Sequence, residues 1–159
     1  MNDTDWDLQT VQDLIEANQH QPGALLPILH AIQKALGYVP AETVPVIADA
    51  LNLSRAEVHG VITFYHFFRQ KPPGRHVIQL CRAESCQAMG GAALEVHAKA
   101  VLGIDYHERT GDGEFSLEPV YCLGNCAASP AIMIDDTVYG RVTPDRFNAL
   151  TRQTEPSHD

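Results

Sequence analysis

The chain has 159 residues, 45% of them hydrophobic, and its 20 Asp and Glu residues outnumber 11 Lys and Arg residues to give a formal net charge of −9. This charge argues against binding to nucleic acid or to an anionic membrane surface, because both require a basic face. The N-terminus lacks the pattern of a signal peptide and no apolar run approaches the roughly 18 residues of a membrane span, so we expect a cytoplasmic protein with no membrane insertion.

Residues 6–69 are predicted to be helical. Two helices have apolar residues repeated every three or four positions: Leu8, Val11, Leu14 and Ile15 in the first, and Leu25, Leu26, Ile28, Leu29, Ile32 and Leu36 in the second. Gly37 is a natural helix stop, and PAETVPVIADALNL predicts a short third helix. The fourth, SRAEVHGVITFYHFF, opens with Ser54 three residues before Glu57, a capping-box signature, and is expected to include the aromatic residues of 64–68.

The prolines and glycine of KPPG (71–74) predict a boundary, with a helical bundle domain in residues 1–72 and a second domain in residues 73–159. The second domain is predicted to hold a strand in HVIQL, a helix over residues 86–103, two strands in YHERT and FSLEPVYC, a hairpin in AIMIDD and TVYG, and a last helix in TPDRFNALTRQ capped by Thr143. This order indicates an α+β protein in which helices pack on a small mixed sheet.

The four cysteines of the chain fall in two pairs, each after a predicted strand: Cys81, Cys86, Cys122 and Cys126. Loops at strand ends often carry binding residues, because the sheet holds them rigidly. Small residues surround both pairs and allow the backbone to come close to a bound group, and Gly124 can adopt left-handed geometry. Four thiols in such loops indicate a metal or redox site.

Several kinds of site use four cysteines. Structural zinc is one, although zinc ligands usually come as Cys-x2-Cys knuckles and neither pair has that spacing. Disulfides are disfavoured by a reducing compartment, and a redox-active dithiol is more often Cys-x-x-Cys. A [2Fe-2S] cluster takes two thiolates per iron, and two separated pairs can supply them. The spacing favours the cluster and leaves zinc and inert thiols open.

The pattern Cys-x4-Cys, then 35 residues, then Cys-x3-Cys resembles the thioredoxin-like 2Fe-2S ferredoxin family. The resemblance extends over nearly the whole chain, through SRAEVHGVITFYHFF in the first half and YCLGNCAASPAIMIDDTVYGRVTPDRF in the second. It implies a thioredoxin-like second domain and one 2Fe-2S cluster with Cys81, Cys86, Cys122 and Cys126 as ligands. Such chains are the small subunits beside the flavin subunit in respiratory complex I, NAD-linked hydrogenases and molybdenum-dependent formate dehydrogenases.

The first cysteine loop, CRAESCQAMGG, is similar to that of the gamma subunit of NAD-dependent formate dehydrogenase. The resemblance implies a non-catalytic electron-transfer subunit of an NAD-linked oxidoreductase. Its direct partner would be a beta subunit that binds FMN and NAD, and a molybdenum cofactor would lie in an alpha subunit. The equivalent subunit of complex I or of a hydrogenase is the alternative, and a zinc-stapled adaptor without a redox role is the alternative from another class.

Three other features carry expectations. Not all the aromatic residues of FYHFF (64–68) can point inward, so some are expected on a partner surface. Arg82, directly after a predicted ligand, would place a cation beside an anionic cluster unless it faces solvent. Ser129-Pro130 lies where thioredoxin-like folds often carry a cis-proline, although most X-Pro bonds are trans.

Overall fold

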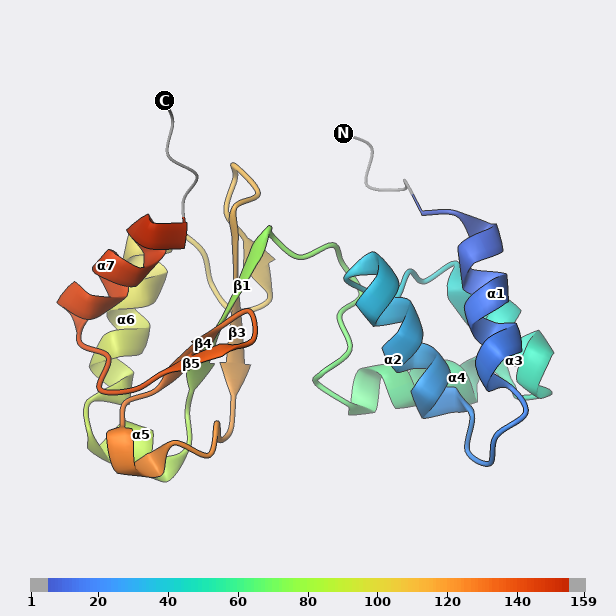
Figure 1. Ribbon diagram of the computed structural model, residues 1–159, viewed down its shortest axis with the longest axis horizontal. Coiled ribbons are helices and arrows are strands. Elements are labelled where there is room, and N and C mark those ends of the chain that lie inside the picture. Colours follow the sequence, from blue (N-terminus) through green and yellow to red (C-terminus); the bar gives the residue numbers. More distant parts are fainter. Residues whose placement is uncertain (1–5, 155–159) are drawn as a thin grey trace. The chain divides into compact units, whose positions relative to one another are not determined.

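The computed structural model describes residues 6–154 (Figure 1). The chain forms two compact units, Met1–Pro72 and Pro73–Asp159. Within the described range, the first unit contains four α-helices and the second contains three α-helices, a short 3-10 helix and five strands. The mixed α/β composition agrees with the prediction.

The first unit consists of α1 (Leu8–Asn18), α2 (Leu25–Leu36), α3 (Thr43–Leu51) and α4 (Arg55–Phe64). Each helix contributes fully buried aliphatic residues to one core, among them Val11, Ile28, Leu29, Ile32, Ile47 and Val58. Leu8, predicted on the same face as Val11, Leu14 and Ile15, is 46% exposed at the first position of α1.

Two predicted helix boundaries are confirmed, the end of α2 and the start of α4. Gly37 ends α2 with a left-handed φ of 83°. At the start of α4 the Ser54 hydroxyl accepts from the Glu57 backbone N–H at 3.1 Å, and the Ser54 backbone N–H donates to Glu57 Oε2 at 2.8 Å. This capping box satisfies two donors that a bare helix end would leave unpaired.

The fourth helix is shorter than predicted, since α4 ends at Phe64 and Tyr65 has an extended backbone. Buried Gln33 of α2 explains the difference. Its amide donates from Nε2 to the Phe67 carbonyl at 2.8 Å and accepts from the Arg69 N–H at 2.7 Å. These side-chain bonds replace helical ones, so the aromatic segment 65–68 lies along the first unit as a turn.

The second unit is built on a sheet with the order β2-β3-β1-β4-β5. Its strands are β1 (His76–Cys81), β2 (Glu108–Arg109), β3 (Phe115–Val120), β4 (Ile132–Ile134) and β5 (Thr137–Tyr139). Strand β1 runs parallel to β3 and antiparallel to β4, and the other two pairs are antiparallel. The predicted strands are confirmed, although β2 is only two residues long, and the sheet is mixed as expected.

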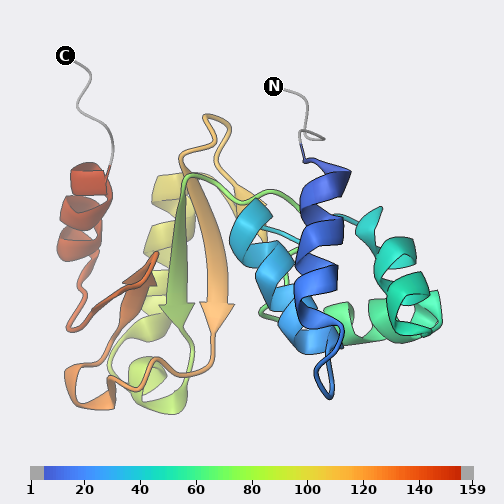
Figure 2. The same ribbon diagram turned by 45° about the vertical axis from the view of Figure 1, so that its right-hand side comes forward.

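One face of this sheet is apolar, because buried residues such as Ile78 and Leu80 of β1 and Ile132 and Ile134 of β4 alternate with less buried ones. Helices α6 (Gly91–Leu102) and α7 (Pro144–Thr154) lie on the same side of the sheet (Figures 1 and 2). Their residues Leu94, Ala98 and Phe147 share a buried core with the strands, which contribute Ile78, Leu80, Phe115, Leu117, Ile132 and Ile134. The Thr143 hydroxyl accepts from the Arg146 N–H at 3.2 Å, as expected for its capping position.

The single helix predicted over residues 86–103 is wrong. The chain instead forms α5 (Glu84–Ala88) and α6, separated by a turn in which Gly90 has a φ of 96°. A Cβ atom at Gly91 would lie 2.6 Å from the Cys86 carbonyl oxygen. The two adjacent glycines therefore allow α6 to begin directly against the first cysteine loop.

Candidate functional site

The sheet brings the two cysteine pairs to one end of the second unit. Cys81 is the last residue of β1 and lies in register with Val120, the last residue of the parallel strand β3. The loops that leave these two strands therefore start side by side. Cys86 lies in α5, Cys122 follows β3 by two residues, and Cys126 begins the 3-10 helix Cys126–Ala128.

The two pairs differ in exposure. The side chains of Cys81 and Cys86 are buried, with exposed fractions of 7% and 2%, in a small apolar cluster with Ala131. Cys122 and Cys126 are exposed. One side of the site is thus shielded from water, and the other side lies at the surface of the second unit.

Hydrogen bonds hold the loops against each other. The Arg82 N–H donates to the Val120 carbonyl at 2.7 Å, which joins the starts of the loops. The Ser129 hydroxyl donates to the Cys126 carbonyl at 2.7 Å and lies 2.8 Å from the Ser85 hydroxyl. Helix α5 therefore lies beside the 3-10 helix (Figure 2).

The four thiols form one electrostatically linked set. Burial raises the pKa of the Cys81 thiol, and its interaction with Cys86 raises it further. A hydrogen bond with Cys122 raises the pKa of the Cys126 thiol, and the negative charges of the Cys122 and Cys86 thiolates add to this effect. Cys86 thus interacts with a member of each pair. A bound cation would remove this mutual repulsion by neutralising the thiolates.

Backbone N–H groups point at the sulfur atoms. Those of Ala83 and Leu123 bond to the Cys81 sulfur and lower its pKa, against the larger effect of burial. The Gly124 N–H donates to Cys122 Sγ at 3.3 Å, and Gly124 has the expected left-handed φ of 72°. Donors aimed at sulfur suit an anionic group, so this set of thiols and N–H groups fits an iron–sulfur cluster.

Gly140 lets the chain after β5 pass close to the second cysteine loop. A Cβ atom at Gly140 would lie 2.7 Å from the Ala128 Cβ and 2.8 Å from the Ala128 carbonyl oxygen. The next residue, Arg141, donates its N–H to that same oxygen at 2.6 Å. The Ser129–Pro130 bond in this loop is cis. Sequence reasoning missed Gly140 and noticed Ser129 only as the residue before a proline, since both look like ordinary loop residues there.

Arg82 does not stand free beside the cysteines. Its Nε lies 3.0 Å from Glu95 Oε2 of α6, and its guanidinium lies 5.5 Å from the centre of the Tyr106 ring. The positive charge expected next to Cys81 is therefore partly compensated by a carboxylate, and its effect on a cluster stays a prediction.

Residues 6–154 contain no group of three or more His, Cys, Asp or Glu side chains placed to hold a single metal ion. A two-iron cluster does not require such a group, because each iron takes two thiolates.

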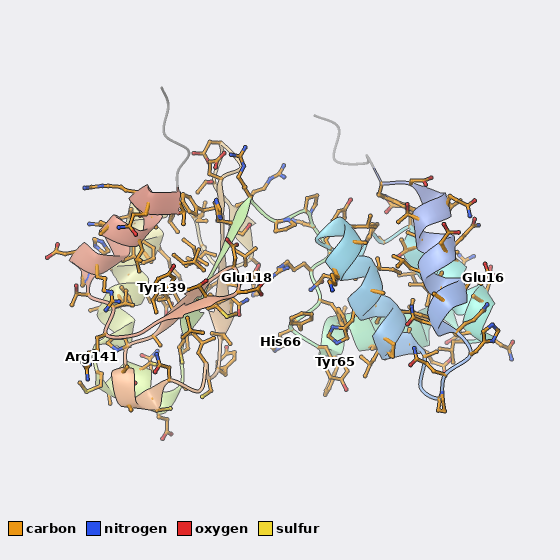
Figure 3. The ribbon with its side chains drawn as sticks, viewed as in Figure 1. Glu16, Tyr65, His66, Glu118, Tyr139 and Arg141 are labelled. Carbon is orange, nitrogen blue, oxygen red and sulfur yellow. The ribbon has the colours of Figure 1, made fainter. Side chains whose placement is uncertain are left out.

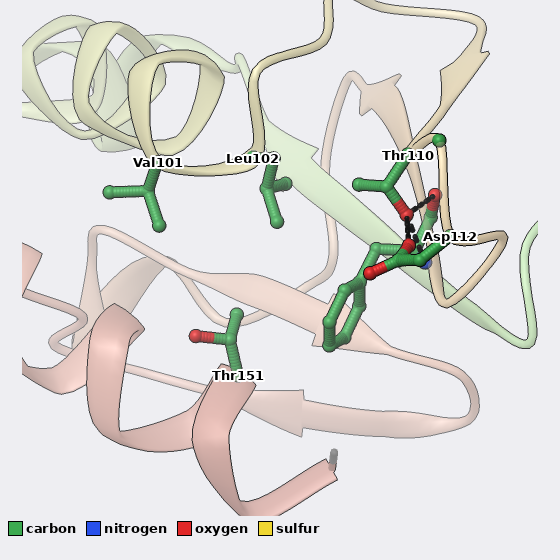
Figure 4. Close-up of a pocket in the computed structure, with 7 residues that line it drawn as sticks. Val101, Leu102, Thr110, Asp112 and Thr151 are labelled. Carbon is green, nitrogen blue, oxygen red and sulfur yellow. Dashed lines mark hydrogen bonds between the residues drawn. The ribbon is translucent and has the colours of Figure 1, made fainter.

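A cavity of about 250 Å³ lies elsewhere, at the far end of α6 (Figure 4). Its wall combines apolar side chains with the hydrogen-bonded pair Thr110 and Asp112, and its lining residues are Val101, Leu102, Thr110, Gly111, Asp112, Phe115 and Thr151. None of the cysteines lines it.

No helix within residues 6–154 has the length and apolar character needed to cross a bilayer.

Comparisons with known proteins agree on the family. The model of the thioredoxin-like [2Fe-2S] ferredoxin family matches residues 11–155. The HndA protein of Solidesulfovibrio fructosivorans, which belongs to an NADP-reducing hydrogenase, is 39% identical over 141 residues, which cover 88% of this chain and 82% of that protein. A component of the NADH-quinone oxidoreductase of Pseudomonas aeruginosa is 38% identical over 141 residues, or 86% and 85% of the two chains.

Among solved structures, a chain of an NAD⁺-reducing [NiFe]-hydrogenase in its H₂-reduced state superposes with a TM-score of 0.66 at 28% identity. The match covers 79% of this chain and 22% of the hydrogenase chain, so this protein corresponds to about a fifth of that longer polypeptide. The fold, the site and the matches over most of the sequence give one conclusion: this chain belongs to the thioredoxin-like [2Fe-2S] ferredoxin family.

Proposed function

We propose that this chain is an electron-transfer subunit of an NAD-linked oxidoreductase, and that Cys81, Cys86, Cys122 and Cys126 hold one [2Fe-2S] cluster in it. The observation that carries the proposal is the convergence of the two cysteine loops on one end of the sheet, with backbone N–H groups directed at the sulfur atoms of Cys81 and Cys122. The family and the names of the relatives support it. When bound, the cluster supplies one-electron transfer.

The buried and the exposed cysteines would have different roles in such a site. The buried pair, Cys81 and Cys86, would fix the cluster on the side packed against the protein. The exposed pair, Cys122 and Cys126, would hold it on the side that faces solvent or a partner. Electron transfer to a partner requires a short path, so the loop of the exposed pair is the natural place of closest approach.

The direct partner in this proposal is a subunit that binds FMN and NAD. An apolar surface suited to such a partner lies on the first unit, where Phe64, Tyr65 and Phe67 are 75%, 42% and 57% exposed. Tyr65 and His66 mark this segment in Figure 3. Phe68 is buried and anchors it, and the centre of the Phe67 ring lies 5.0 Å from that of the His30 ring.

We further propose that the complex is an NAD-dependent formate dehydrogenase, with a molybdenum cofactor in its alpha subunit and this chain as the gamma subunit. The sequence of the first cysteine loop, CRAESCQAMGG, supports this choice. The relatives named above are subunits of a hydrogenase and of an NADH-quinone oxidoreductase, and these two complexes are the alternatives. Purifying the chain from its host and identifying the subunits that accompany it decides among the three.

The cluster proposal is tested on anaerobically purified protein. We expect about two iron atoms and two acid-labile sulfides per chain, with loss of both when Cys81 or Cys122 is replaced by Ser. The isolated chain should be reduced by dithionite but should oxidise neither NADH nor formate, and addition of the flavin subunit should allow NADH to bleach its absorbance. About one zinc per chain without sulfide would instead indicate the zinc-stapled adaptor.

A further inference from the structure

A buried hydroxyl lies between the two cysteine loops. Ser129 is 7% exposed, and its Oγ has three polar neighbours: the Cys126 carbonyl oxygen at 2.7 Å, the Ser85 Oγ at 2.8 Å and the Cys86 Sγ at 3.7 Å. The Ser85 hydroxyl also reaches the Cys126 carbonyl, at 3.2 Å. The pair therefore joins the backbone of one predicted ligand to the sulfur of another.

The number of protons limits what these groups can do. Each serine hydroxyl donates one hydrogen bond and accepts others, whereas the carbonyl only accepts. With a free thiol at Cys86, the S–H donates to Ser129 and the Ser129 hydroxyl donates to the Cys126 carbonyl. All of the contacts are then satisfied, and the Cys86 sulfur accepts nothing from the serines.

An iron-bound thiolate carries no proton and can only accept. We propose that, with a cluster bound, the Ser129 hydroxyl turns to donate to Cys86 Sγ while Ser85 takes over the Cys126 carbonyl. Both partners are already within reach at 3.7 Å and 3.2 Å, so the exchange requires only rotation of two hydroxyl groups. This inference rests on the ligand set proposed above.

The exchange has a consequence for redox chemistry. Hydrogen bonds to cluster sulfurs help to set the reduction potential, and a donor stabilises the more negative, reduced state. Reduction adds one electron to the cluster and no proton to either serine. Ser129 is therefore a residue that raises the potential, and Ser85 makes this possible by releasing Ser129 from the carbonyl.

The test compares the reduction potentials of four cluster-loaded chains: the wild type, Ser129→Ala, Ser85→Ala and the double variant. We expect Ser129→Ala to reduce the equilibrium constant for reduction about threefold to tenfold, a part of what a hydrogen bond to a charged group contributes. Ser85→Ala should shift it in the same direction, because Ser129 must then return to the carbonyl. The double variant should match Ser129→Ala, since the two serines act as one unit.

Ser129→Thr, which keeps the hydroxyl, should restore the potential, and Ser54→Ala in the first unit is a matched control that should leave it unchanged. A wild-type potential in Ser129→Ala, or additive shifts in the double variant, would overturn the inference.

If Ser129→Ala does not hold a cluster, resonance Raman spectra of the wild type and Ser85→Ala in H₂O and D₂O decide. The deuterium shift of the Fe–S(Cys) bands should be smaller in the variant, and equal shifts would contradict the proposal. Iron and sulfide content in the wild type tests the cluster itself, separately from these comparisons.

Discussion

Arg82 and Glu95 form an ion pair with an Nε–Oε2 distance of 3.0 Å, which ties the residue after Cys81 to helix α6. Lys99, one turn further along the helix, contacts Glu95 at 2.9 Å and Asp105 at 2.8 Å. Positive and negative side chains therefore alternate along this series of contacts, which leads away from the cysteine loop. Burial opposes ionisation of Glu95, but the hydrogen bond from Lys99 and the nearby cations lower its pKa overall, so its carboxylate is charged at neutral pH.

This ion pair predicts opposite effects from its two members on the reduction potential. Glu95→Gln leaves the Arg82 charge uncompensated and should raise the potential, while Arg82→Ala should lower it. Each shift should be about 20–70 mV, the Coulomb energy of one charge roughly 10 Å away for effective dielectric constants of about 80 to 20. Redox titration at low salt measures both, with Glu16→Gln on the first unit as the control. Shifts of the same sign would show that the variants act through structure rather than charge.

Gly140→Ala should destabilise the second cysteine loop. The added methyl group would meet the Ala128 Cβ at 2.7 Å and its carbonyl oxygen at 2.8 Å, so the loop that carries Cys126 must move. Overpacking of this kind typically costs about 1–3 kcal/mol. Thermal loss of the cluster absorbance should occur at a lower temperature than in the wild type. Gly111→Ala, in the same unit with open space around its Cβ, is the matched control, and equal losses in the two variants would contradict the prediction.

The parts of the fold that were correctly predicted depend on local chemistry. The capping box of α4, the glycine at the end of α2 and the hairpin of β4 and β5 each follow from residues close together in sequence. The cysteine spacing likewise points to one candidate site, because the sequence has only four thiols, and that these four are the ligands stays a prediction.

The parts that were missed depend on contacts between distant segments. α4 ends early because Gln33, more than thirty positions away, bonds to the backbone of residues 67 and 69. Arg82 is paired because α6 brings Glu95 beside it. Ser129 becomes a neighbour of Cys86 only once the loops leaving β1 and β3 have been placed side by side. The hydrophobic pattern and the turn signals of the sequence do not reveal these contacts between distant residues.

Ser54→Ala should weaken the first unit, because it removes the acceptor for the Glu57 N–H at the start of α4. Loss of such a cap typically costs about 1 kcal/mol. The fluorescence of Trp6, the only tryptophan of the chain, follows unfolding of this unit, since its ring packs against the first core. Glu42→Ala is the matched control: Glu42 occupies the N-cap of α3 but makes no capping bond, so its loss should leave the Trp6 transition nearly unchanged.

The same cap predicts a response to acid. The Ser54 backbone N–H, followed by its hydroxyl, holds the pKa of Glu57 below its usual value. A carboxyl with a lower pKa in the folded state stabilises the fold above its unfolded pKa, and this contribution is lost as the pH falls through the folded value. Wild-type stability followed by Trp6 should therefore decrease below about pH 4.5 more than that of Glu57→Gln. Parallel curves for the two proteins would show that Glu57 does not contribute.

The exposed aromatic residues on the first unit predict where assembly is sensitive. Phe64 and Phe67 are 75% and 57% exposed, and aromatic side chains that become buried on binding often contribute most of an interface's energy. Phe67→Glu should weaken binding to the flavin subunit about 30-fold, equivalent to about 2 kcal/mol. The Phe67 carbonyl, which accepts from Gln33, is unaffected because it belongs to the backbone, so the fold should remain intact.

The binding test uses the cluster-loaded chain and the purified flavin subunit. Affinity is measured by calorimetry, and NADH-dependent bleaching reports whether the cluster remains within electron-transfer reach. Phe67→Lys should weaken binding like Phe67→Glu if apolar contact is what is lost, whereas opposite effects of the two charges would indicate an electrostatic contact. Leu8→Lys, a partly exposed apolar residue of α1 in the same unit, is the control and should bind normally. Normal binding by both Phe67 variants, with iron content unchanged, would exclude Phe67 from the interface and leave the cysteine loops of the second unit as the expected docking surface.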